Sequence, residues 1–382
     1  MRIIKYLFIS LVMLAFTSCI DRFYLDNSSN SKPKIVIEGN LIDNCEEQTI
    51  TVSYTSSTEK AEFLGLSGCQ VVVVDQNSMV FNFSEKAEST GVYSGTIPEE
   101  YLMPGNQFKV IVQTPDGNRY KSSYEEMLPC PPVDSVYYLL EHHETETSGE
   151  MIDGLQFYID FNATNYFGKF YRWIVEETYE YHATWLATEY WDPDRIYREG
   201  SASFVCYKTE VLNDINLLST DGLTQNRYTK AKLHFVDDHS QRLLYQYSIL
   251  VRQHSLSKQS YSYWGDLKKN NQATDGLYTK QPARPRGNLV NENDSTEVVL
   301  GYFSVSSETT KRIVVNSVPE LKFYDVGLCD AEFSTGPLPY HKLVFFVYDN
   351  APDGTFQKGR TTIDCVDCKK QGGVVEKPDF FK

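Results

Sequence analysis

One cysteine near the start of the chain lies in a context that predicts chemical modification of its thiol. Two basic residues open the chain, Tyr6–Phe16 is a short apolar run, and two small residues precede Cys19. A positive start, a short apolar segment and small residues before a cleavage point are typical of an export signal. The apolar run is also too short to cross a bilayer. We therefore expect a bacterial lipoprotein signal peptide over residues 1–18, with cleavage before Cys19 and acyl chains such as palmitate attached there.

Seven cysteines remain once Cys19 carries lipid, and this odd number leaves at least one of them unpaired within the chain. Cys365 and Cys368 have the spacing CxxC. Zinc usually needs a second such pair, and a redox CxxC normally opens a helix after a strand. Here Gly372 and Gly373 follow closely. We expect this pair to take part in a structural disulfide, with Cys329 as a further candidate, while the spacing leaves the connectivity open.

Three segments resemble catalytic or metal-binding motifs, but each lacks a required residue. The segment 65–69 would be a nucleophile elbow if Cys69 were glycine. His143-Glu144 starts like a zinc-protease helix, but Thr147 replaces the second histidine. The segment 349–360 resembles a calcium loop that has Arg360 in place of the bidentate glutamate. We assign no catalytic residue, metal or cofactor from the sequence.

Tyrosine and phenylalanine are abundant, with 27 and 21 residues. They fit a pleated, half-buried strand, and they also supply rigid area with a polar tip for a binding face. The arginines among aromatic residues or prolines could form structural ion pairs or recognise a carboxylate or sugar. Our ligand-binding candidates are Arg172, Trp173, Trp185, Trp191 and Arg284.

The formal net charge of the chain is −15. Nucleic acid binding requires a basic surface, so this composition argues against a nucleic-acid partner. Anionic lipid headgroups would be repelled as well. The acyl chains on Cys19, and not a basic patch, should hold the protein on its membrane.

The composition divides the chain after the signal peptide into three parts. Residues 19–32 are polar and are expected to form a tether. Residues 33–130 contain short strands separated by turn signals, which predicts an immunoglobulin-like β-sandwich. A proline-rich segment at 128–132 marks the boundary, because proline cannot sit in a central strand. The expected strands are Lys34–Glu38, Gln48–Tyr54, Cys69–Asp75, Met79–Phe83, Gly91–Thr96 and Phe108–Gln113.

Residues 131–382 predict a larger β-rich domain with one amphipathic helix, so the whole chain is expected to be mainly all-β. The helix is Ser257–Asn270, with Ser257 as its N-cap and aromatic residues at helical spacing. Thr178–Trp191 could be a strand, a hairpin or an aromatic loop. The expected strands are Ser135–Leu140, Gly154–Phe161, Phe170–Glu177, Leu243–Gln253, Val298–Ser307, Lys311–Asn316 and Lys342–Tyr348.

The ordered set of motifs resembles a Bacteroidota family of lipoproteins classed as domain of unknown function 4249. The resemblance implies an outer-membrane lipoprotein, often encoded beside a TonB-dependent transporter, and brings no established catalytic residues. Many surface-exposed lipoproteins of this phylum carry several acids after the lipidated cysteine, whereas Ile20–Arg22 has one acid and then a base. The matching segments are the export signal and Cys19, Ile35–Gly39, Pro131–Ser135, Tyr171–Trp173, Tyr247–Gln253, Tyr261–Trp264, Gln281–Asn288, Leu300–Phe303, Cys365–Cys368, Gly372–Gly373 and the final Lys-Pro-Asp-Phe.

These features together favour a non-enzymatic lipoprotein anchored in the outer membrane through its N-terminal lipid. We expect it at the cell surface, with the periplasmic face as the alternative. Its expected role is that of an accessory subunit that captures substrate for, or gates, a TonB-dependent transporter. The first alternative is a free-standing adhesin or glycan-binding module, and the second is a glycan or peptide hydrolase.

Overall fold

The structure is a computed structural model. The predicted signal peptide, the predicted tether with Cys19, and Arg284 lie outside the described residues. Strands greatly outweigh helices in the described part, which confirms the prediction of a mainly β chain. No helix there is both long and apolar enough to span a membrane. The described residues are 33–56, 62–144, 151–187, 189–192, 195–198, 202–272, 285–323, 329–333, 337, 343–350 and 356–382.

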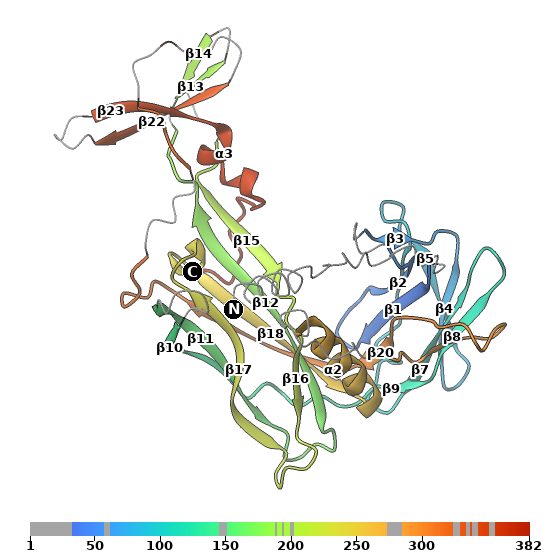
Figure 1. Cartoon of the computed structure of the whole chain (residues 1–382). Helices are drawn as coiled ribbons and strands as arrows, with labels where there is room; N and C mark the ends of the chain where they lie inside the picture. Colours follow the sequence, from blue (N-terminus) through green and yellow to red (C-terminus); the bar gives the residue numbers. More distant parts are fainter. Residues whose placement is uncertain are drawn as a thin grey trace, which may run out of the picture. The chain divides into compact units, whose positions relative to one another are not determined.

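The N-terminal strands form one large curled sheet around a single core (Figure 1). Its order is β19-β8-β7-β4-β5-β6-β2-β1-β20, with β3 on β2 and β9 on β7. The strands are β1 (Ile35–Ile42), β2 (Gln48–Tyr54), β3 (Leu64–Gly65), β4 (Gln70–Asp75), β5 (Val80–Glu85), β6 (Val92–Gly95), β7 (Gln107–Gln113), β8 (Arg119–Ser122), β9 (Glu125–Glu126), β19 (Leu289–Asn291) and β20 (Phe303–Ser306).

The alternation of inward-facing and outward-facing side chains along the strands explains which residues enter this core. In β7, Phe108, Val110 and Val112 are fully buried while their neighbours face outward. Successive side chains of a strand point to opposite faces, so a period of two produces one apolar face. Burial of each such side chain contributes about 1.5–3 kcal/mol. The turn after β7 uses Gly117 at a positive φ of 90°, which an Asp-Gly pair favours.

Two strands of this sheet come from far along the chain. β20 pairs in parallel with β1, and β19 pairs with β8. The predicted domain boundary at residue 130 places both of these strands in the C-terminal domain, although they pair with strands of the N-terminal sheet. The boundary itself stays a prediction. β20 begins at Phe303 and not at Val298 as expected, because Gly301 turns the chain there at a φ of 92°. A Cβ on Gly301 would lie 2.0 Å from the Ile37 carbonyl oxygen, so the close approach to β1 requires glycine.

Two further sheets pack against a second core, with orders β10-β11-β17 and β15-β12-β18-β21, and with β16 on β12. Side chains from both sheets meet there, among them Phe157, Ile159, Val175, Tyr247 and Ile249. The strands are β10 (Ser135–Glu144), β11 (Met151–Asn162), β12 (Phe170–His182), β15 (Val205–Val211), β16 (Asn216–Ser219), β17 (Arg227–Asp237), β18 (Tyr247–Leu256) and β21 (Glu308–Val315).

The helix α2 (Lys258–Gln272) lies close to its predicted range. Ser257 is its N-cap, since its hydroxyl oxygen accepts the backbone N–H of Ser260 at 3.1 Å. The preceding strand β18 starts at Tyr247, later than predicted, because Gln241–Leu243 form the 3₁₀ helix η1 instead. Tyr263 packs on Tyr302 of the loop before β20, with ring centroids 4.9 Å apart.

A small fourth sheet joins two strands from the middle of the chain to two strands from its last part, which also forms two short helical turns. Its order is β14-β13-β22-β23. Both cysteines of the CxxC motif are bonded, but to separate partners: Cys368 to Cys206 and Cys365 to Cys329. Cys45, Cys69 and Cys130 are free. The elements are β13 (Glu189–Asp192), β14 (Arg195–Arg198), β22 (Val344–Asn350), β23 (Phe356–Thr361), α3 (Ile363–Val366) and η3 (Cys368–Gln371).

A buried glutamate–histidine pair lies where the chain passes from β20 to β21. The Glu308 carboxylate is 2.8 Å from His254 of β18, and both side chains are almost fully buried. Asn44 also donates to Glu308, whose own N–H donates to Asp43. Burial alone would raise the pKa of Glu308, but the hydrogen bonds from His254 and Asn44 and the charge of Arg252 together hold it below its ordinary value. The pair therefore joins the first sheet to the second core.

The close approach at Gly301 yields a prediction about stability. Gly301→Ala should lower the free energy of unfolding by about 2–4 kcal/mol, because the new methyl group meets the Ile37 carbonyl and the φ is strained. Gly117→Ala is the matched control, with a φ of 90° and no atom within 4 Å. It should cost about 1–2 kcal/mol from backbone strain alone. Urea denaturation of both variants measures the difference, and equal losses would contradict the steric argument.

The Glu308 pair yields a prediction about pH. A carboxyl whose folded-state pKa is lowered contributes stability above its unfolded value, and that stability is lost as the pH falls through the folded-state pKa. Glu308→Gln should cost about 3 kcal/mol at pH 6, because His254 loses its buried partner. The difference between wild type and variant should shrink as the pH falls below the ordinary value of 4.5. A difference that stays constant from pH 6 to pH 3.5 in urea titrations would contradict it.

Candidate functional site

The C-terminal half of β12 presents a row of polar and aromatic side chains. Glu177, Tyr179 and Tyr181 alternate along the strand and so share one face. On the neighbouring strand β15, Lys208 pairs with Tyr179 and Glu210 pairs with Glu177. The register of two adjacent strands thus gathers these five side chains on one surface.

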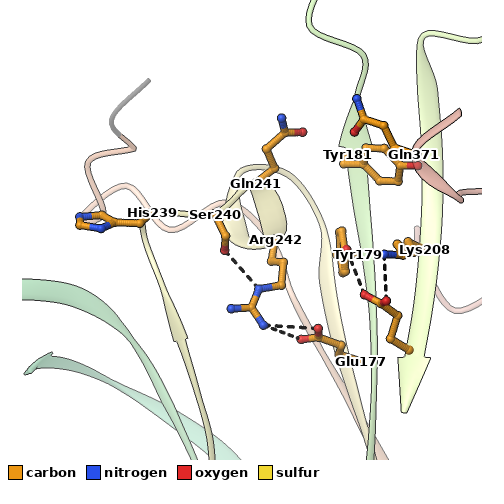
Figure 2. Close-up of a pocket in the computed structure, with 10 residues that line it drawn as sticks. Glu177, Tyr179, Tyr181, Lys208, His239, Ser240, Gln241, Arg242 and Gln371 are labelled. Atoms are coloured by element: carbon orange, nitrogen blue, oxygen red, sulfur yellow. Dashed lines mark hydrogen bonds and ion pairs between the residues drawn. The ribbon is translucent and has the colours of Figure 1, made fainter. Parts of the chain in front are cut away.

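These side chains form one wall of a pocket of about 440 Å³ (Figure 2). The segment that leads into β18 forms a second wall, with Ser240 and the η1 residues Gln241 and Arg242. Gln371, at the end of η3, closes part of the rim. Figure 2 shows Arg242 extending toward Glu177, with Tyr179 and Lys208 on the other side of the pocket. Its volume falls in the range of roughly 300–1,000 Å³ that is usual for small-ligand sites.

Glu177 is buried at the base of the pocket, where hydrogen bonds and a neighbouring cation compensate its negative charge. Its carboxylate accepts hydrogen bonds from the Tyr247 hydroxyl at 2.8 Å and from Arg242 at 3.4 Å. His234 also lies 3.8 Å away, but burial lowers its pKa and favours the neutral ring. Arg242 is held in turn by Ser240, whose hydroxyl accepts its Nε–H at 3.1 Å. The positive charge of Arg242 is thus paired with a carboxylate of the protein.

The second carboxylate, Glu210, has partners on both of its oxygens. Lys208 Nζ lies 2.8 Å from one oxygen, and the Tyr179 hydroxyl donates to the other at 3.2 Å. The hydrogen bond from Lys208 is the main reason that the pKa of Glu210 is lowered. Burial raises the pKa of Tyr179, so its phenol stays protonated as a donor. Each carboxylate of the pocket is therefore paired with a cation, and the lining is close to electrically neutral.

The disulfide between Cys206 and Cys368 fixes the C-terminal wall. It joins β15 to η3, and the Tyr181 hydroxyl donates to the Cys368 carbonyl at 2.6 Å. Gly373 follows, where a Cβ would lie 2.3 Å from the Tyr181 hydroxyl. Glycine is required at this position because the chain passes directly over the ring. Tyr181 and Gln371 are therefore held in place before any ligand arrives.

Chemically, the pocket offers aromatic surface and convergent hydrogen-bonding groups. The Ser240 hydroxyl is engaged with Arg242, and His239 lies 3.7 Å from Asp238. Among the described residues, no group of three or more histidine, cysteine, aspartate or glutamate side chains could hold a metal ion. This arrangement is suited to hold a polar ligand by stacking and hydrogen bonding.

The structure separates the predicted ligand-binding residues from this pocket. Arg172 lines another pocket, where its guanidinium stacks on Trp264 with 3.5 Å between the guanidinium carbon and the ring centroid. Trp173, the next residue, points to the opposite face of β12. It is only 3% exposed and its indole N–H donates to Gln253 at 2.9 Å. Such burial makes Trp173 a core residue and leaves no surface of its ring for a ligand.

The remaining candidates lie near the small fourth sheet or outside the described residues. Trp185 donates its indole N–H to the Cys329 carbonyl at 3.0 Å and meets Phe333 edge-on. Trp191 lies in β13 opposite Val344 and is half-buried. Arg284 is outside the described residues. The structure thus does not bring the five predicted residues into one site.

The pocket of Figure 2 was not predicted from the sequence, although its main signal is present there. The sequence of Thr178–Trp191 is compatible with a strand, a hairpin or an aromatic loop, while β12 continues to His182. Continuing the alternation from Glu177 would have put Tyr179 and Tyr181 on the same face. The contributions of Arg242 and Gln371 depend on contacts between segments far apart in sequence, which no local pattern indicates.

Comparison with known proteins gives one finding. A family model described as a domain of unknown function (DUF4249) matches residues 20–312, which is most of the chain. No curated protein matches the sequence. The matched range includes the β12 and β15 residues of the pocket and Arg242 and ends before Gln371.

The buried pair at the base of the pocket predicts non-additive mutations. Arg242→Met should lower the free energy of unfolding by about 3 kcal/mol, because Glu177 keeps a buried charge without its cation. The double variant with Glu177→Gln should recover at least half of this loss, since Tyr247 can still donate to the amide oxygen. Urea denaturation of the two single variants and the double variant tests the coupling. Strictly additive losses would contradict it.

Proposed function

Since the chain belongs to the family described as a domain of unknown function (DUF4249), its role must be argued from its own residues, and we propose a non-enzymatic, lipid-anchored outer-membrane protein. In this proposal it captures a ligand for a TonB-dependent transporter. The pocket of Figure 2 is its ligand-binding site. The transporter enters the proposal because the related lipoproteins are often encoded beside one.

Support for the anchor comes from the N-terminal sequence. A short apolar run and small residues precede Cys19, and a polar tether of residues 19–32 follows. The two disulfides fit an exported protein, because disulfides persist in oxidising compartments. The negative net charge leaves the acyl chains as the means of attachment.

The observation that carries the proposed activity is the charge pairing inside the pocket. Arg242 is committed to Glu177 and Lys208 to Glu210. A charged ligand would have to break one of these pairs or remain uncompensated, which is costly in a partly buried site. A neutral ligand incurs no such cost. We therefore assign a neutral, polyhydroxylated ligand, such as an uncharged oligosaccharide, to this pocket.

The geometry of the lining supports this ligand class. The ring of Tyr179, which is only partly buried, offers a flat surface on which the C–H face of a sugar can stack. Gln241, Gln371 and Lys208 supply hydrogen-bonding groups at the rim. A sugar hydroxyl both donates and accepts, so it can add to the existing pairs without displacing them.

The tether gives the capture step a physical purpose. A binding module fixed to the same membrane as a transporter holds its ligand at a high effective concentration near the pore. The polar residues 19–32 would allow the folded part to reach a neighbouring protein while its lipid stays inserted. Capture followed by transfer needs moderate affinity, which a half-open pocket with stacking contacts can provide.

The binding test uses the detergent-extracted full-length protein and a panel of uncharged oligosaccharides in titration calorimetry. Tyr179→Ala should weaken binding of the best panel member about tenfold, because a stacking surface is lost. Tyr228→Ala, an exposed tyrosine on β17, is the matched control and should leave the affinity unchanged. Failure of every panel member to bind, or equal effects of the two variants, would overturn the assignment.

The partner test uses affinity purification of the tagged native protein from solubilised envelopes. A transporter should co-purify in stoichiometric amounts, and Cys19→Ala should lose both membrane attachment and the transporter. Recovery of the lipidated protein without a partner would favour the alternative of a free-standing glycan-binding module. Hydrolysis of a bound oligosaccharide would overturn the non-enzymatic assignment.

A further inference from the structure

A second pocket, of about 310 Å³, differs from the pocket of Figure 2 because its two charged residues do not form an ion pair with each other. It is formed between β1, β12, α2 and the segment around β20, and it shares no residue with the pocket of Figure 2. Its charged residues are Glu38 and Arg172. Its apolar and aromatic lining comes from Ile174, Tyr263, Trp264 and Tyr302.

Arg172 has an incomplete set of partners. Its guanidinium stacks on Trp264, with the guanidinium carbon 3.5 Å from the ring centroid. Its Nε is buried and has no hydrogen-bond partner. Among the described residues, no carboxylate lies within ion-pair distance of Arg172. Burial lowers the pKa of Arg172 to about 10, which still leaves it charged at neutral pH.

Stacking on Trp264 has a geometric consequence. It fixes the plane of the guanidinium, which limits the directions in which its N–H groups can donate. A guanidinium in a fixed plane matches the planar oxygens of a carboxylate, which can accept two parallel hydrogen bonds. An unpaired buried donor costs free energy, and a ligand carboxylate would relieve this cost.

Glu38 supplies the opposite charge in the same pocket. It is on β1, where its side chain is exposed at the rim, and desolvation by the surrounding walls raises its pKa. The charge of Arg172 opposes this shift, so the two groups influence one another without forming an ion pair. A ligand with a single charge would satisfy one of the two groups and leave the other without a partner.

We propose that this pocket binds a small zwitterion, an α-amino acid, with its carboxylate on Arg172 and its ammonium group on Glu38. The apolar part of the ligand would pack on Ile174 and Trp264. The charges of an α-amino acid are close together and opposite in sign, as the two unpaired groups require. This site is additional to the proposed oligosaccharide pocket, so either can fail without the other.

Three probes that share the leucine side chain test the assignment in titration calorimetry at pH 7 with the full-length protein. Leucine carries both charges, N-acetyl-leucine only the carboxylate and leucinamide only the ammonium group. Leucine should bind at least about tenfold more tightly than either derivative, because each derivative loses one charge-assisted contact. Absence of leucine binding, or equal affinities for leucine and N-acetyl-leucine, would overturn the proposal.

Two variants separate the roles of the charged residues. Glu38→Gln should remove the preference for leucine over N-acetyl-leucine while binding of N-acetyl-leucine persists. Arg172→Gln should reduce leucine binding by about tenfold or more. Glu46→Gln, at an exposed position of the loop between β1 and β2, should leave all three affinities unchanged. Should Arg172→Gln unfold, the result with Glu38→Gln still decides, and an unchanged preference there would overturn the proposal.

Discussion

The arrangement of the two cores depends on how the chain is fixed where it passes between them. Glu308 and His254 form a buried pair at this passage, and the loop residues Asp43 and Asn44 of the first sheet bind the same glutamate. Gln253, beside His254, donates to the Pro131 carbonyl of the proline-rich segment. Hydrogen bonds of this kind have strict directions, unlike apolar contacts. They fix β20 and β21 at one relative position and thereby bring β1 to the pocket that contains Arg172.

The two pockets show how one strand can serve different purposes on its two faces and at its two ends. β12 contributes Arg172 near its start and Glu177, Tyr179 and Tyr181 toward its end. Between them, Trp173 and Val175 point into the second core and hold the strand. One pocket has its charges paired within the protein, and the other leaves them separate. This contrast follows from the neighbouring strands, since β15 supplies Lys208 and Glu210 only along the later part of β12.

The local sequence pattern was sufficient to predict the position of most single strands and of the helix α2. β2 has its predicted limits, α2 differs from its prediction by one residue at its start and two at its end, and the alternating apolar residues of β7 are buried. These features depend on period and capping, which neighbouring residues determine. The partners of the strands could not be predicted in this way. Nothing in the sequence of β20 indicates that it pairs with β1, because β1 is more than two hundred residues away.

The candidate sites depend even more strongly on contacts between segments that are far apart in the sequence. Arg172 stands out in the sequence as a cation among aromatic residues, but the aromatic ring it meets is that of Trp264 and not that of its neighbour Trp173. In a strand, adjacent side chains point to opposite faces, so Arg172 and Trp173 could not share a site. The alternation that identifies a strand therefore also excludes some pairs from a common pocket, and this exclusion is available from the sequence.

The bond between Cys206 and Cys368 connects residues 162 positions apart. A protease that cuts once within the intervening segment would leave two pieces that remain one covalent molecule. The segment between these cysteines includes α2, β18 and the strands that return to the first sheet. Cleavage there would pass unnoticed in electrophoresis without a reductant, because the disulfide would keep the two pieces together.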